Sequence, residues 1–379
     1  MKHCSQSVTI RHSGHSLCTL QLGVTLVELM VSLALGAFLI FGVMKAFLSG
    51  RQAYSLQQSL SHIQESGRFA HEFIGFDVRS SGDYGCGTGD AFVSSSTPDD
   101  KVSVACAGIN ALNDADDVRY NFGYAVYGYD NVSATTIAAL PYLAPAPIAG
   151  TDILVTHPAS DVGSLTAGVA GAAVDTLAIQ PTTGLARGDF IALSDCANTR
   201  ILQVKTVSTT TIKVVKDGAV VPAPGDRCIV NIPFDAASTV RRLDTVFYYI
   251  GNNTSGVPAL YAYSVSDDVS NELIAGVENM QLKYGVDLQA KGAAGYGLVD
   301  SYKDASAISD TAWNGWDRDA NVVRSVRYYL LIRGEDSVLS DPQTYTFPPT
   351  ASSATTAADL RLRHIFVNTV GIRVRTNPR

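Results

Sequence analysis

Hydrophobic and polar positions follow different patterns before and after residue 80 of this 379-residue chain. From Val24 to Met44 nearly every side chain is apolar, and the exceptions are two small hydroxyls and one carboxylate, Glu28. A run of about 20 apolar residues, at roughly 1.5 Å per residue, matches the ~30 Å hydrocarbon core of a bilayer. We therefore predict a membrane-spanning helix over residues 24–44.

The helical pattern continues beyond this run. Apolar or small residues recur every three or four positions, at Ala53, Leu56, Leu60, Ile63, Gly67, Ala70, Ile74 and Val78. Polar residues occupy much of the rest, and no proline occurs before Pro98. Such a stripe is typical of the core-facing side of an amphipathic helix. We predict one helix over residues 24–80, whose second half carries a head domain.

Strand patterns dominate the rest of the chain. Short β-branched or aromatic runs, bounded by Gly, Pro, Asn or Asp, occur at 152–156, 189–193, 200–204, 211–215, 245–250, 260–265, 273–290, 322–332 and 365–374. Their spacing favours an antiparallel sheet with long loops over alternating βαβ units. The predicted fold is therefore α+β, with a long N-terminal helix and an antiparallel β-rich head over residues 81–379. The head forms one lobe, or two lobes divided near residue 233.

Glu28 is the one ionisable residue of the apolar run. An isolated charge inside a bilayer costs about 2.5 kcal/mol or more, and two buried charges are tolerated mainly when they neutralise each other. The segment from Gly23 to Leu29, GVTLVEL, resembles the type III signal of type IV pilins and type II secretion pseudopilins. The resemblance implies that a prepilin peptidase cuts after Gly23 and methylates the amine of Val24. It also implies that Glu28 pairs with the N-terminal amine of a neighbouring subunit.

Val24 departs from the signal, in which this residue is usually Phe, but it keeps an apolar side chain and we expect processing to occur. Residues 1–23 form the predicted leader; they contain Lys2 and Arg11 and no acid, as suits a cytoplasmic segment. An ordinary signal anchor with an incidental Glu28 is the alternative. A cleaved secretory peptide fits less well, because its apolar region usually spans only about 7–15 residues.

Four further segments resemble the PilW minor pilins. They are RSSGDYGC at 79–86, GDFIALSDC at 188–196, ELIAGVENMQ with YGVD within 272–287, and LRHIFVNTVGIR at 362–373. The resemblance implies a pilin-like fold and a low-abundance subunit that helps to initiate type IV pili near the tip. It implies a single-pass protein of the bacterial inner membrane, with the head in the periplasm, that later joins the cell-surface pilus.

The resemblance also implies the partners. These are other minor pilins, the major pilin, the prepilin peptidase, the inner-membrane assembly platform, membrane lipid before assembly, and a tip adhesin as a further candidate. A type II secretion pseudopilin is the nearest alternative function. A tip-exposed adhesin or DNA receptor is another, with residues 88–147 as its surface.

Four cysteines follow the leader: Cys86, Cys106, Cys196 and Cys228. An even number in an oxidising compartment favours two disulfides. Three connectivities exist, and we prefer Cys86 with Cys106 and Cys196 with Cys228, because each pair closes a local loop. Each disulfide would stabilise the folded state by roughly 3 kcal/mol. Zinc is a weak alternative, since no Cys-x-x-Cys spacing occurs.

Catalytic and ligand-binding motifs are missing from the sequence. It has no nucleophile elbow, no phosphate-binding loop and no zinc-protease motif, so we predict neither an enzyme nor a cofactor site. The acidic clusters at 114–117 and 267–268 lack the calcium-loop pattern. A formal net charge of −7 disfavours general nucleic-acid binding, although arginines gather between residues 361 and 379 and could face a partner.

Overall fold

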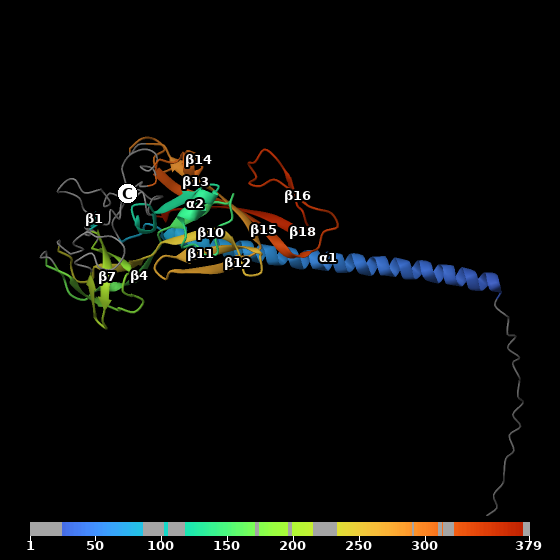
Figure 1. The fold of residues 1–379 in the computed structure, drawn as a ribbon, viewed down its shortest axis with the longest axis horizontal. Coiled ribbons are helices and arrows are strands. Elements are labelled where there is room, and N and C mark those ends of the chain that lie inside the picture. Colours follow the sequence, from blue (N-terminus) through green and yellow to red (C-terminus); the bar gives the residue numbers. More distant parts are fainter. Residues whose placement is uncertain are drawn as a thin grey trace, which may run out of the picture. The chain divides into compact units, whose positions relative to one another are not determined.

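The computed structural model confirms the predicted fold class: one long helix, α1 (Leu26–Ser80), is followed by an antiparallel β-rich head (Figure 1). The structure describes residues 25–85, 102–104, 118–170, 174–195, 199–214, 233–289, 292–309, 313 and 322–373. The chain divides into two compact units, residues 1–55 and residues 56–379.

The first unit contains the N-terminal part of α1. The hydroxyl of Thr25 accepts a hydrogen bond from the backbone N–H of Glu28 at 3.2 Å, which caps the first turn. The large hydrophobic side chains from Leu26 to Leu48 are all more than half exposed. Among the described residues, α1 is the helix that is long and apolar enough to cross a membrane.

The second part of α1 belongs to the head and is amphipathic. Ile63, Ala70, Ile74 and Val78 are fully buried, as the predicted stripe requires, and Gly67 is buried between them. Nearer the N-terminus the predicted stripe is less buried, and Leu60 is 37% exposed. Burial of Ile63, Ile74 and Val78 stabilises the fold by about 1.5–3 kcal/mol for each side chain.

One wall of the head is a five-stranded antiparallel sheet. Its order is β12-β11-β10-β3-β2, with β2 (Val126–Tyr129), β3 (Ile153–Thr156), β10 (Val246–Asn252), β11 (Pro258–Ser264) and β12 (Val269–Ala275). The short helices η2 (Val118–Tyr120) and α2 (Ala134–Ala139) lie before and after β2 in the chain.

A four-stranded antiparallel sheet forms a second wall. Its order is β14-β13-β15-β18, with β13 (Val277–Asp287), β14 (Ser301–Lys303), β15 (Val322–Ser337) and β18 (Arg361–Gly371). The turn η3 (Ala305–Ala307) follows β14, and the small hairpin β16 (Thr344–Tyr345) and β17 (Thr355–Thr356) lies between β15 and β18 in the chain.

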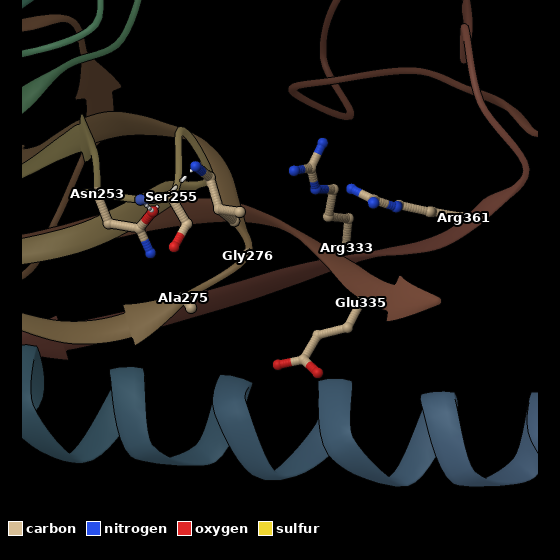
Figure 2. A pocket seen from close by; sticks show the side chains of 9 residues that line it. Asn253, Ser255, Ala275, Gly276, Arg333, Glu335 and Arg361 are labelled. Atoms are coloured by element: carbon tan, nitrogen blue, oxygen red, sulfur yellow. Dashed lines mark hydrogen bonds between the residues drawn. The ribbon is translucent and has the colours of Figure 1, made fainter. Parts of the chain in front are cut away.

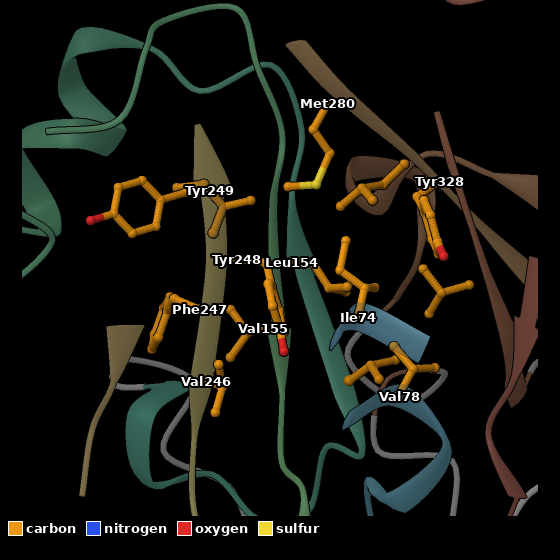
Figure 3. Close-up of a cluster of buried hydrophobic side chains, with 14 of the residues drawn as sticks. Ile74, Val78, Leu154, Val155, Val246, Phe247, Tyr248, Tyr249, Met280 and Tyr328 are labelled. Atoms are coloured by element: carbon orange, nitrogen blue, oxygen red, sulfur yellow. The ribbon is translucent and has the colours of Figure 1, made fainter. Parts of the chain in front are cut away.

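The main core lies where α1 meets both sheets. Figure 3 shows Ile74 and Val78 of α1 together with Tyr248 of β10, Met280 of β13 and Tyr328 of β15. All five side chains are buried in one continuous cluster. The helix is therefore part of the core of the head, and the two sheets share it.

A closed six-stranded barrel is inserted between β3 and β10. Its strands follow the order β7-β6-β9-β4-β5-β8, and the pairing of β7 with β8 closes the ring. They are β4 (Ala159–Leu165), β5 (Thr176–Gln180), β6 (Phe190–Ser194), β7 (Thr199–Val207), β8 (Thr211–Val214) and β9 (Thr239–Leu243). The strand β1 (Val102–Val104) pairs with β7 in parallel.

The barrel has its own hydrophobic core. Leu177, Ile191, Leu202 and Val240 are fully buried in it, and they come from four different strands. Both cores lie within the unit formed by residues 56–379, so a division of the head into lobes near residue 233 stays a prediction.

Candidate functional site

Glu28 lies in the first turn of α1 and is exposed. Its carboxylate makes none of the hydrogen bonds or ion pairs found among the described residues; only its backbone takes part, where the Ser32 hydroxyl donates to the Glu28 carbonyl at 2.7 Å. The side chain is thus a single charge on an apolar helical surface. The proposed partner of that charge belongs to a different chain.

The other residues expected to carry function lie outside the described part of the chain. These are the cleavage position at Gly23 and Val24, and the four cysteines Cys86, Cys106, Cys196 and Cys228. Processing, methylation and the disulfide pairing therefore stay predictions.

Two polar contacts join α1 to the sheets. The Nδ1 atom of His71 contacts the Tyr328 hydroxyl of β15 and the Asn368 amide of β18. On the other side, the Tyr248 hydroxyl of β10 donates to Asp77 Oδ2 at 2.7 Å. The helix is thereby fixed in rotation, since each polar group faces a different sheet.

Burial changes the acidity of both helix residues. It lowers the pKa of His71, with a smaller lowering from the positive charge of Arg79. It raises the pKa of Asp77 to about 6, while the hydrogen bond from Tyr248 acts in the opposite direction. These two contacts hold the helix in the head.

An apolar groove runs along the same helix. Phe69, Phe73 and Phe76 are 40%, 43% and 67% exposed, and they form one side of a groove of about 590 Å³. Side chains of β10, β11 and β12 form the opposite side: Val246, Tyr248, Ala262, Ser264, Asn271 and Leu273. Glu72 and Asp77 also line it, so the groove offers apolar contact beside acidic groups.

The groove was not predicted from the sequence, although the sequence contains a signal for it. The three phenylalanines stand at positions i, i+4 and i+7, which places them on one helical face beside the buried stripe. Attention to exposed apolar positions, in addition to the core-facing ones, would have found them.

Two of the sequence's charged clusters have structural partners. Arg363, expected in an exposed basic patch, has a side chain only 6% exposed and pairs with Glu278 and Asp359. Asp267 pairs with Arg242 at 3.2 Å, and Asp268 accepts a hydrogen bond from Tyr263 at 2.7 Å. Within the described ranges, no group of three or more His, Cys, Asp or Glu is placed to hold a metal ion.

Comparison with known families gives one match. Residues 247–374 match the family model described as Type IV Pilus-assembly protein W. No match was found among curated proteins. The matched segment runs from β10 through β18, and it therefore includes the residues that hold α1 through Tyr248, Tyr328 and Asn368.

Proposed function

We propose, because residues 247–374 match the family model described as Type IV Pilus-assembly protein W, that the chain is a minor pilin of the PilW family. In this proposal, a prepilin peptidase removes residues 1–23 and methylates the amine of Val24. The apolar part of α1 first anchors the protein in the inner membrane, with the head in the periplasm. It then packs among the helices of other subunits when the pilus is initiated.

The observation that carries the proposal is the exposure of the apolar half of α1. Each of its large side chains is more than half exposed from Leu26 to Leu48. At about 25 cal/mol per Å² of apolar surface, leaving this face in water is strongly unfavourable. A helix of this kind requires an apolar environment throughout the life of the protein, which lipid and then neighbouring helices both supply.

Glu28 sets the position of the subunit in this scheme. Its carboxylate lacks a partner within the described residues, and burial of an unpaired charge is costly. Pairing with the methylated amine of a neighbour removes that cost only at the correct axial position. The head then contacts other minor pilins, the major pilin and the assembly platform in a tip complex.

Intact-mass analysis of the full chain, purified from membranes with and without a co-expressed prepilin peptidase, tests the processing step. We expect loss of residues 1–23 and addition of one methyl group only with the peptidase. Retention of the leader in both samples would contradict the proposal.

Piliation of cells tests the role of Glu28. The variant Glu28→Ala should lower the number of pili, whereas Glu65→Ala, which removes an exposed carboxylate from the head part of the same helix, should leave it unchanged. Equal behaviour of the two variants would argue against charge pairing.

A deletion strain separates the pilus from a secretion machine. Loss of pili and of twitching is the expected result. Loss of enzyme secretion with intact pili would assign the protein to a type II secretion pseudopilus instead.

A further inference from the structure

A second hollow in the head has charged side chains in its lining and lies at the end of both sheets. It has a volume of about 300 Å³ and is lined by the turn after β10, by Ala275 at the end of β12 and Gly276 after it, and by residues of β15 and β18. Figure 2 shows Arg333 and Arg361 on one side of it and Asn253 and Ser255 on another.

An ion-pair network lies behind this hollow. Arg363 donates from Nε to Glu278 Oε2 at 2.7 Å, from Nη2 to Glu278 Oε1 at 2.8 Å, and from Nη1 to Asp359 Oδ1 at 2.6 Å. Arg333 donates from Nη1 to Glu278 Oε1 at 3.2 Å and lies 4.0 Å from Asp359. Two arginines and two carboxylates therefore neutralise one another.

Arg361 adds a third guanidinium. Its backbone joins the network, since its N–H donates to Asp359 and its carbonyl accepts from Arg363. Its side chain, which lines the hollow, makes no hydrogen bond or ion pair with the described residues. The Nε and Nη2 groups of Arg333 are also without a protein acceptor there. Counting Glu335, which also lines the hollow, the three arginines are balanced by three carboxylates, so the wall has no net charge but several N–H donors that no described acceptor uses.

The remaining lining residues restrict what can bind. The Oδ1 atom of Asn253 accepts from the backbone N–H groups of Ser255 and Val257, both at 3.0 Å, which keeps the turn in shape. The Ser255 hydroxyl is exposed and free to donate. Glu335 also lines the hollow, and Figure 2 shows its side chain extending toward α1, away from the two guanidinium groups.

We propose that this hollow is a binding site for a single carboxylate group, held by the guanidinium of Arg361 with Arg333 and Ser255 beside it. A guanidinium binds a carboxylate through two parallel N–H···O bonds, which matches the donors available. Because Glu335 also lines the hollow, a more highly charged anion such as phosphate is disfavoured, and a single carboxylate is the anion that suits the free donors of Arg361 and Arg333. The site is separate from the α1 surface on which the minor-pilin proposal rests.

Calorimetric titration of the full chain in detergent tests the site with a matched pair of probes. N-acetylglycine carries a carboxylate and an amide N–H, and N-acetylglycinamide has nearly the same shape without the charge. We expect binding of the acid only. The variant Arg361→Gln should weaken that binding at least about tenfold, while Arg187→Gln, which removes an exposed arginine of the barrel, should leave it unchanged.

Two further measurements make the result decisive. The Arg361→Gln protein should melt at the wild-type temperature, because the side chain has no partner among the described residues. Glu335→Gln should bind the acid as tightly as the wild type or more tightly. Equal binding of the two probes, or wild-type binding by Arg361→Gln, would overturn the proposal.

Photo-crosslinking in cells identifies the source of the carboxylate. A photo-reactive residue at Ser255 should capture an acidic or C-terminal segment of a partner chain, and the adduct should disappear in Arg361→Gln. Binding of N-acetylglycine without any protein adduct would assign the site to small free carboxylates.

Discussion

The two parts of α1 form one unbroken helix in secondary structure, yet their side chains have opposite environments. Residues 26–48 expose every large apolar side chain, whereas residues 63–78 bury a narrow stripe and join the main core of the head. The difference arises from sequence pattern, because an apolar surface all around a helix needs an apolar solvent and a stripe needs only one packed face. Substitutions that are identical in chemistry should therefore have different effects in the two parts.

The largest difference is expected for truncation of aliphatic side chains. Ile74 is fully buried between the two sheets, so Ile74→Ala should lower the free energy of unfolding by about 2–5 kcal/mol. Leu39→Ala removes a side chain that is 68% exposed and should leave the melting temperature of the head unchanged. Thermal unfolding of the full chain in detergent measures both, and similar losses would show that the two parts are not energetically distinct.

Of the two parts of α1, we expect the part that is packed in the head to make stability depend on pH. Burial raises the pKa of Asp77 to about 6, above its value of about 4 in an unfolded chain. Between these values the folded state binds more protons than the unfolded state, so stability falls as the pH rises from about 4 to 6, by up to about 3 kcal/mol.

The variant Asp77→Asn should lack this fall while keeping the hydrogen bond from Tyr248. His71 has a lowered pKa and acts in the opposite direction, because acid must protonate it against burial. The difference between wild type and Asp77→Asn isolates the carboxyl group. Parallel curves of melting temperature against pH would show that Asp77 does not titrate in this range.

Replacement of glycine by alanine should change stability in opposite directions in the two parts of α1. A Cβ atom at Gly67 would collide with the ring of Phe366, so Gly67→Ala should destabilise the head by about 1–3 kcal/mol. Gly42 has nothing within 4 Å of the added atom, and Gly42→Ala should strengthen the helix by up to about 1 kcal/mol. Circular dichroism during unfolding distinguishes the two, and a loss at Gly42 would point to close packing around the first part.

Local pattern was sufficient to predict the helix and the longer strands, but not β4, β5 and β9 of the barrel. The buried positions of α1 follow from spacing alone, and strands near residues 153, 190, 246 and 322 lie where β-branched runs occur. The expected strand over 273–290 is in fact divided between β12 and β13. The cause is Gly276, whose φ of 84° turns the chain in a region that side chains rarely adopt.

Features that depend on distant partners could not be predicted in the same way. Arg363 alternates with apolar neighbours as an exposed strand residue would, but Glu278, 85 positions earlier, pairs with it and buries it. The closed barrel depends on the pairing of β7 with β8 across a ring of six strands, and its strands resemble those of an open sheet. The motif from Gly23 to Leu29 predicts cleavage by a peptidase and pairing of Glu28 with another subunit. Both involve a second protein chain, so they stay predictions.

The point of insertion of the barrel also determines where this protein can change in length. Thr156 and Val246 are direct partners in neighbouring strands, so the chain leaves and re-enters the five-stranded sheet only about 5 Å apart. A two-residue hairpin can span that gap. The barrel between Thr156 and Val246 can therefore be exchanged, enlarged or lost during evolution, while the strands that contact α1 keep their register.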